Sequence, residues 1–273
     1  MGKRSSLLSA FVVPIACSAA LLGALFAAIP ALAANTIFTP GTYGYDISFP
    51  QLAGPYPVSF ATPSQTNSRV TTFGIIGVTG GRAYSQNPFL SAQYRWVTGY
   101  NSAPLTPAFY INLSAAVGTT APNGLAGPKG NCAPSDLACV AYNFGYNAAQ
   151  KDYAYATSEK VKASSWWLDI ETANSWSDDT SLNDLVIQGA IDFLSAQYYS
   201  PTQKIAVGIY SNPYMWKEIA GDFAPKLPVW FTGADSQQTM PEYCSPRYSF
   251  GGGTVTAVQY WGGDTFDLEY SCP

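Results

Sequence analysis

The strongest constraint on the fold is a repeated alternation between short apolar runs and helix-like patterns. The apolar runs have the length of buried strands, and the segments between them carry apolar residues at helical spacing. Such alternation favours parallel strands joined by right-handed crossovers. Strands are predicted over residues 43–47, 72–78, 107–113, 165–170, 205–210, 228–231 and 254–260, and helices over residues 87–97, 142–160, 181–197 and 213–220.

This pattern predicts an α/β fold in a single domain, with a TIM-like (β/α) barrel as the leading architecture. An open, doubly wound sheet is the alternative. No Gly-x-Gly-x-x-Gly follows a predicted strand, and no P-loop pattern occurs. A nucleotide-binding site is therefore not indicated, and we expect no cofactor.

The N-terminus has the features of a signal peptide. Lys3 and Arg4 precede an apolar run that extends to about Ile29 and ends in Ala-Leu-Ala at residues 31–33. A positive start, an apolar stretch and a small-x-small end are typical of a cleaved secretory signal. We therefore predict a signal peptide over residues 1–33 and a barrel domain over residues 34–273.

Two alternatives remain for this segment. The apolar run is long enough for an uncleaved membrane anchor, and Cys17 raises the alternative of a lipoprotein. Pro14 and Pro30 favour cleavage instead. Cleavage would leave a mature protein that is not embedded in a membrane and is either extracellular or associated with the cell wall. We also expect it to be a monomer.

Charge and composition exclude several functions. Without Lys3 and Arg4, 11 basic residues face 17 acidic ones, a net charge of −6, which disfavours nucleic acid as a partner. Charged residues make up 11% of the chain and aromatic residues 15%, as in many secreted proteins that bind carbohydrate. The chain has no histidine, so Ser-His and Cys-His nucleophiles are excluded and a metal site is not expected.

The cysteines indicate disulfides. Removal of Cys17 with the signal leaves four, an even number in an exported chain. Three connectivities are possible on paper. We expect the local pairing, which joins Cys132 to Cys139 and Cys244 to Cys272.

The segment Trp166–Glu171 carries the strongest chemical signal. In a strand, Trp167, Asp169 and Glu171 share one face, and the opposite face is wholly apolar. The two carboxylates lie about 6–7 Å apart along the strand, at its carboxyl end. Two close carboxylates in a cleft of low dielectric cannot both ionise freely, so the pKa of one should rise, which gives a general acid suited to glycosidic cleavage.

Other strand ends supply further candidates for the same edge. Asp46 lies at the end of the first predicted strand, and Asp267 follows the last one. At the carboxyl end of a barrel, such acids surround one pocket. The residues predicted to contact the substrate are Trp167, Tyr210, Trp230, Gln259 and Trp261.

In order along the chain, five segments resemble those of family 25 glycoside hydrolases, the Chalaropsis-type lysozymes. The Asp-x-Glu with its apolar context is the most specific of them. The segments are Tyr45-Asp46-Ile47-Ser48, Phe73 to Gly81, Leu168-Asp169-Ile170-Glu171, Gly208-Ile209-Tyr210-Ser211, and Val258-Gln259-Tyr260 followed by Asp267.

The resemblance implies a flattened (β/α) barrel that hydrolyses the β-1,4 bond between N-acetylmuramic acid and N-acetylglucosamine in peptidoglycan. It implies that Glu171 is the general acid and that Asp169 orients the N-acetyl group or stabilises positive charge. Asp46 and Asp267 would line the pocket. If the acetamide itself attacks, no protein nucleophile is needed.

The chain departs from the family pattern at three places. The turn after the second strand reads Thr79-Gly80-Gly81 where the family has an acid, the third strand reads Phe109 to Asn112 without histidine, and the loop around Cys132 is an insertion. Two other functions therefore stay open. One is a catalytically silent barrel that binds glycans, and the other is an extracellular scaffold.

Overall fold

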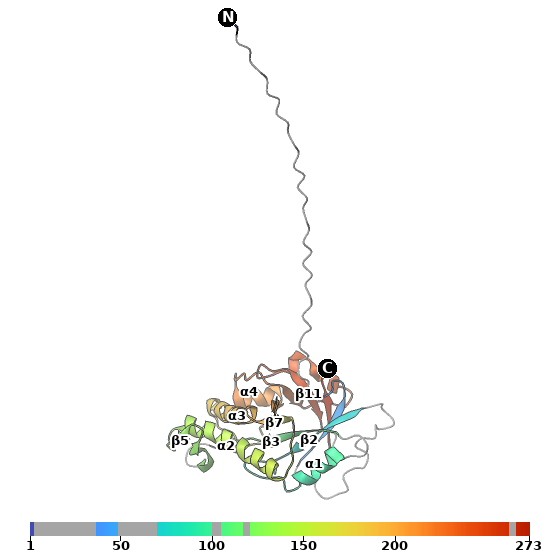
Figure 1. Ribbon diagram of the computed structural model, residues 1–273. Coiled ribbons are helices and arrows are strands. Elements are labelled where there is room, and N and C mark those ends of the chain that lie inside the picture. The colour runs from blue at the N-terminus through green and yellow to red at the C-terminus, as the bar shows by residue number, and fades with distance from the viewer. Residues whose placement is uncertain (3–36, 49–69, 100–104, 117–120, 262–265) are drawn as a thin grey trace. The chain divides into compact units, whose positions relative to one another are not determined.

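The computed structural model describes residues 1–2, 37–48, 70–99, 105–116, 121–261 and 266–273 (Figure 1). The chain divides into two compact units, Met1–Ala34 and Asn35–Pro273. Of the first unit only Met1 and Gly2 are described. The predicted signal peptide therefore lies almost wholly outside the described residues and stays a prediction. The fold described below is that of the second unit.

Eight strands of this unit form a closed barrel. Neighbouring strands run parallel, except that the last strand, β12, is antiparallel to both β1 and β11. In order around the barrel, the strands are β1 (Tyr43–Ile47), β2 (Thr71–Gly77), β3 (Thr106–Asn112), β6 (Ser165–Asp169), β9 (Ala206–Ser211), β10 (Val229–Thr232), β11 (Val255–Tyr260) and β12 (Asp267–Ser271).

Four α-helices lie outside the barrel in the described residues: α1 (Leu90–Gly99), α2 (Leu137–Ser158), α3 (Thr180–Ser195) and α4 (Pro213–Ala220). The smaller elements are the 3-10 turns η2 (Pro122–Gly124), η3 (Met240–Cys244) and η4 (Pro246–Tyr248), and two hairpins, β4 (Ala126–Gly127) with β5 (Gly130–Asn131) and β7 (Tyr198–Ser200) with β8 (Gln203–Lys204). None of the helices in the described ranges is both long and apolar enough to cross a bilayer.

The closed barrel confirms the predicted α/β class, and the open-sheet alternative is wrong. The architecture differs from a regular TIM barrel, in which every strand is parallel and is followed by a helix. Here η3 and η4 stand between β10 and β11, and β12 reverses direction. The reversal has a simple cause, because β11 ends at Tyr260 and β12 begins at Asp267, which is too short a connection for a parallel crossover.

The core has two layers that the strand alternation separates. Trp166 and Leu168 point outward and pack with the helices. Trp167 points inward, into the aromatic interior of the barrel. This confirms the predicted division of the 166–171 segment into an apolar outer face and an inner face. The interior cluster comprises Phe38, Phe73, Ile75, Ala108, Trp167, Tyr210, Trp230 and Ala257.

Helices α2 and α3 lie side by side (Figure 1) at a contact formed by two glycines. A Cβ atom on Gly145 of α2 would lie 1.8 Å from the carbonyl oxygen of Val186. A Cβ atom on Gly189 of α3 would lie 2.2 Å from the carbonyl oxygen of Tyr142. The two backbones therefore approach closely in both directions, and neither position has room for a side chain.

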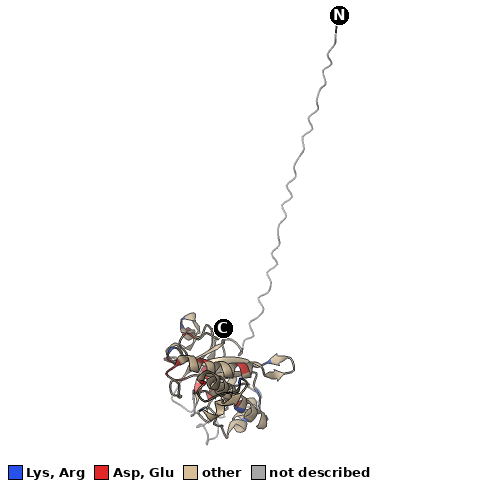
Figure 2. Ribbon diagram, turned by 90° about the vertical axis from the view of Figure 1, so that its left-hand side faces the viewer, with Lys and Arg blue, Asp and Glu red and all other residues tan. Residues whose placement is uncertain are grey.

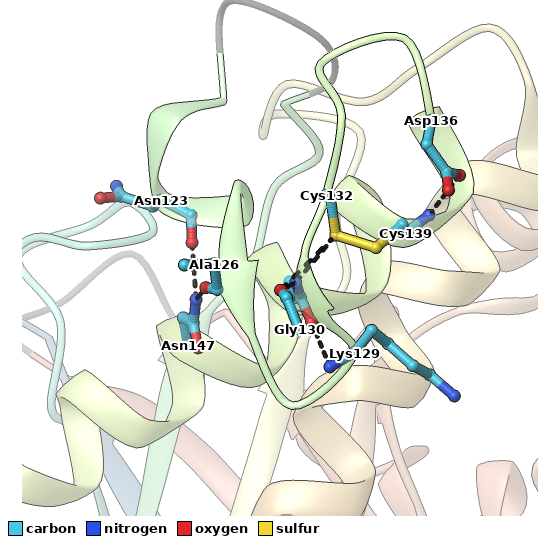
Figure 3. Close-up of a disulfide and its surroundings, with 9 residues drawn as sticks. Asn123, Ala126, Lys129, Gly130, Cys132, Asp136, Cys139 and Asn147 are labelled. Carbon is cyan, nitrogen blue, oxygen red and sulfur yellow. Dashed lines mark hydrogen bonds between the residues drawn. A yellow bond between two sulfur atoms is a disulfide. The ribbon is translucent and has the colours of Figure 1, made fainter.

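Both disulfides have the predicted local connectivity, Cys132–Cys139 and Cys244–Cys272. The first joins the loop before α2 to the first turn of that helix (Figure 3). Asp136 caps the same turn, because its side chain accepts a hydrogen bond from the backbone N–H of Cys139 at 3.1 Å. The second bridge ties the residue after β12 to η3.

One buried acid of α2 costs stability. Asp152 is fully buried, and neither of its carboxyl oxygens has a hydrogen-bond partner among the described residues. Burial raises its pKa well above the ordinary value, which the nearby Lys151 only partly offsets. Because the folded-state pKa of Asp152 is raised, the group costs little stability at low pH, where it is protonated in the folded and unfolded states. The cost appears as the pH rises and the unfolded state ionises more readily than the folded state.

We therefore expect Asp152→Asn to stabilise the protein at neutral pH by about 1–3 kcal/mol, because the amide needs no ionisation. The gain should shrink at about pH 4, where the unfolded carboxyl is itself half protonated. Chemical denaturation at the two pH values measures the difference. Glu218→Gln, on the exposed face of α4, is the matched control. A gain that is equal at both pH values would contradict the assignment.

Candidate active site

A pocket of about 120 Å³ opens at the carboxyl edge of the parallel strands. Asp169 is the last residue of β6, and Gln259 lies one residue before the end of β11. Asp267 opens the antiparallel β12 and pairs with Asp46 of β1, so it reaches the same edge. The residues that line the pocket are Asp46, Ser48, Tyr110, Asp169, Glu171, Tyr210, Trp230, Gln259 and Asp267.

The pocket thus brings together all four predicted acids, Asp46, Asp169, Glu171 and Asp267. None of these described lining residues is Lys or Arg. The acidic positions of the described chain can be followed in red, and the basic ones in blue, in Figure 2. A site that collects carboxyl groups without a lining cation favours their protonated forms, because like charges in a buried cleft cannot all ionise.

Asp169 and Glu171 form the centre of this set. Their side chains are close enough to share a proton, and this interaction raises the pKa of Asp169 and lowers that of Glu171. Burial raises the pKa of both carboxyl groups, and the charge of Asp46 raises both further. The pair therefore titrates together and keeps a proton well above the usual range for carboxylic acids.

Asparagine side chains hold Asp169 in place. Asn112, its neighbour on β3, donates from Nδ2 to Oδ2 of Asp169, and Asn174 donates to Oδ1 at 3.4 Å. The hydroxyl of Thr79 donates to Oδ1 of Asn112 at 2.6 Å, which fixes the orientation of that amide. Thr79 stands in the turn after β2, so a relay of neutral side chains reaches Asp169.

A second network holds Asp46. Gln259 donates from Nε2 to Oδ2 of Asp46 at 2.5 Å. The Oε1 atom of Gln259 accepts hydrogen bonds from the hydroxyls of Tyr210, at 2.7 Å, and Thr232, at 2.8 Å. These donors settle which end of the Gln259 amide faces Asp46. Burial raises the pKa of Asp46, and its hydrogen bonds counteract part of that rise.

Asp267 completes the rim. Burial raises its pKa to about 7, and the charges of Asp46 and Glu171 add to the effect. This carboxyl group therefore changes its charge near neutral pH. The electrostatic field in the pocket changes with it, because Asp267 lies beside Asp46 in the sheet.

The predicted aromatic contacts divide into two groups. Tyr210 and Trp230 line the pocket, with their rings 4.4 Å apart. Trp167 is fully buried in the barrel interior and does not line it. Trp261 follows β11, is 75% exposed and does not line it either. The structure therefore does not bring Trp167 and Trp261 to this pocket; burial excludes Trp167 from contact with substrate, and contact by the exposed Trp261 stays a prediction.

The position of Trp167 has a clear physical reason. It shares the inner face of β6 with Asp169 but lies two residues, about 6–7 Å, further from the edge. Its ring occupies space that Gly208 leaves, since a Cβ atom there would lie 2.2 Å from the indole. Trp167 is consequently part of the floor beneath the pocket.

The sequence interpretation missed several residues of the site. Tyr110 lines the pocket from β3, and its alternation with Asn112 was a usable signal. Glu269 of β12 lies behind Asp46, but no strand was predicted over that segment. In the ranges that the structure describes, no group of three or more His, Cys, Asp or Glu side chains is arranged to hold a metal ion.

Comparison with known proteins gives a match to lysozyme-like proteins. The sequence model of one family, described as Lysozyme-like protein 1, matches residues 137–259. Lysozyme-like protein 5 of Caenorhabditis elegans is 32% identical over 108 residues, which are 38% of this chain and 45% of that protein. The chain therefore matches less than half the length of this curated relative.

Two solved structures of the modular Cpl-1 endolysin with a peptidoglycan analogue also match. One is a mutant in complex with a tetrasaccharide-pentapeptide, with a TM-score of 0.48 and 15% identity. The match covers 86% of this chain and 55% of that one. The other is the wild-type endolysin, with a TM-score of 0.42, 17% identity and the same coverage.

The matched range of the family model divides the pocket. It includes Asp169, Glu171, Tyr210 and Gln259 and leaves Asp46 and Asp267 outside. The similarity to lysozyme-like proteins thus supports a relationship through the segment that carries the central acid pair. Asp46 on β1 and Asp267 on β12 lie outside the matched range and reach the pocket because the barrel closes.

Proposed function

We propose that this protein is an exported glycoside hydrolase that cleaves β-1,4-linked N-acetylated glycans, with peptidoglycan as the leading substrate. The observation that carries the proposal is the convergence of Asp169, Glu171, Asp46 and Asp267 in one pocket without a lining cation. The similarity to lysozyme-like proteins over residues 137–259 supports the same class of activity. The barrel then corresponds to the flattened (β/α) barrel of family 25 glycoside hydrolases.

Glu171 is the general acid in this proposal. Asp169 accepts hydrogen bonds from Asn112 and Asn174, which favour its charged form. The bond between the two side chains raises the pKa of Asp169 and lowers that of Glu171, so in the proposed reaction the shared proton passes to Glu171, the more exposed partner. A raised pKa keeps Glu171 protonated toward neutral pH, so it can protonate the oxygen of the leaving sugar.

Asp169 orients the substrate. As a carboxylate it accepts a hydrogen bond from the N–H of the acetamide group, and it stabilises the positive charge that develops at the ring. The acetamide oxygen attacks the anomeric carbon while the glycosidic bond breaks and the leaving oxygen takes the proton from Glu171. Water then opens the cyclic intermediate and returns a proton to Glu171. Tyr210 and Trp230 provide the aromatic wall of the sugar site.

Digestion of purified peptidoglycan tests the proposal. The wild-type protein should release new reducing ends, and mass spectrometry should identify fragments that end in N-acetylmuramic acid. Chitin oligomers separate a general specificity for N-acetylated glycans from a muramidase. Binding of glycans without any reducing ends, from these or other β-glycans, would refute the enzyme and favour the catalytically silent barrel.

A further inference from the structure

A fifth acid lies directly beneath the pocket. Glu269 belongs to β12, where it pairs in register with Gln259 of β11. Its side chain is fully buried, so it does not touch a substrate. It is also absent from the lining of the pocket. Burial of a carboxyl group at this depth is costly unless the group is neutral or well bonded.

The contacts of Glu269 define its protonation. Trp230 donates from Nε1 to Oε2 of Glu269 at 2.7 Å. No described N–H or O–H donates to its other oxygen, Oε1. The carboxyl group of Asp46 is close enough to share a proton with Glu269, and this interaction lowers the pKa of Asp46 and raises that of Glu269. Two carboxyl groups can form a hydrogen bond with each other only when one of them carries a proton.

The surroundings place this proton on Glu269. Asp46 also accepts the amide N–H of Gln259, and a carboxylate with two donors is stabilised in its charged form. Glu269 has only the indole N–H. The charged groups that face it, Asp46 of β1 and Asp267 of β12, are both acidic and disfavour a charge on Glu269. Gln259 and Trp230, from β11 and β10, are neutral.

We infer that Glu269 is a positioning residue, a permanently protonated acid that donates a hydrogen bond to Asp46 and keeps Asp46 ionised beside the pocket. The role rests on the proposed function, because Glu269 acts on the reaction only through Asp46. The charge of Asp46 in turn raises the pKa of Glu171 and of Asp267. The buried proton on Glu269 thus helps Glu171, on the opposite side of the pocket, to stay protonated.

Two variants of matched size test this role. In Glu269→Gln, the amide oxygen can accept from Trp230 and the amide N–H can donate to Asp46, so the variant reproduces a protonated acid. It should keep kcat/KM within about threefold of the wild type, with the same dependence on pH. Glu269→Met fills similar space but donates nothing.

In Glu269→Met, Asp46 loses a donor and ionises less readily, so the pKa of Glu171 should fall. The basic limb of the kcat/KM profile should then move toward lower pH. At a fixed pH above that limb, kcat/KM should fall by up to about tenfold if the limb moves by about one pH unit. An unchanged profile in Glu269→Met would overturn the inference. So would a displaced profile in Glu269→Gln.

A second measurement does not depend on activity. Wild-type Glu269 is protonated in the folded state but ionises in the unfolded state above about pH 4.3. Raising the pH therefore destabilises the wild type relative to Glu269→Gln, and the ratio of their unfolding constants should change by up to about tenfold per pH unit. A ratio that does not change with pH would overturn the inference.

Infrared difference spectra of the wild type minus Glu269→Gln at neutral pH give the same answer directly. They should contain the carbonyl band of a protonated carboxylic acid, and a carboxylate band in its place would refute the assignment. Both physical measurements decide the protonation of Glu269 even if the protein releases no reducing ends. In that outcome the proposed hydrolase activity is refuted, and the two measurements still test whether Glu269 is protonated.

Discussion

Replacement of Glu171 by glutamine should lower kcat for glycan hydrolysis by about 10²–10⁴-fold. Glutamine keeps the size and much of the hydrogen bonding of the side chain, but it has no proton to give to the leaving oxygen. Because Glu171 lies at the pocket and not in the core, the melting temperature and glycan affinity should change little. The release of reducing ends, measured beside a thermal melt and a binding isotherm, separates these effects.

The exposed Glu242 offers a matched control for this substitution. Glu242→Gln makes the same chemical change on η3, away from the lining of the pocket, and should leave kcat unchanged. A Glu171→Gln protein that retains more than about a tenth of wild-type activity would show that another group supplies the proton. Asp267, with a pKa of about 7, would then be the next residue to replace.

Substitution of Gly145 by alanine should be among the most damaging single-methyl changes in the fold. The new methyl group would lie 1.8 Å from the carbonyl oxygen of Val186, so α2 and α3 must separate. Overpacking of this kind costs about 3 kcal/mol, which corresponds to a fall of about 6–12 °C in melting temperature for a domain of this size. A thermal melt measures the change.

Gly99→Ala is the control for backbone effects. Gly99 lies in α1, and an added Cβ atom there meets no heavy atom within 4 Å. Alanine favours a helix over glycine by about 0.5–1 kcal/mol, so Gly99→Ala should leave stability unchanged or slightly improved. If Gly145→Ala behaves in the same way, the close approach of α2 and α3 is not a constraint.

The sequence predicts the parts of the fold that depend on local pattern. Residues 43–47 and 213–220 form the expected strand and helix with the expected bounds. Asp46, Asp169 and Gln259 meet because each stands near the carboxyl end of a parallel strand, and this edge is common to the barrel. Alternation within a strand is enough to place them on the inner face.

The parts that failed depend on distance and direction, which no local pattern records. Trp167 shares a face with Asp169, yet depth below the edge makes it a core residue. The antiparallel course of β12 follows from a short connection, and it brings Glu269 to Trp230 across 39 positions. The neutral relay from Thr79 through Asn112 likewise joins two strands, so the residues of one strand alone do not reveal it.

The closing strand also determines when the pocket can exist. The bond between Gln259 and Asp46 spans 213 positions, and Asp267 comes later still. A ribosome must therefore release nearly the whole barrel domain before these acids meet, and such long-range pairing is slow to form. During synthesis the carboxyl groups stay apart and hydrated, with the ordinary acidity of exposed carboxylic acids. Whatever chemistry the pocket performs begins only once the barrel has closed.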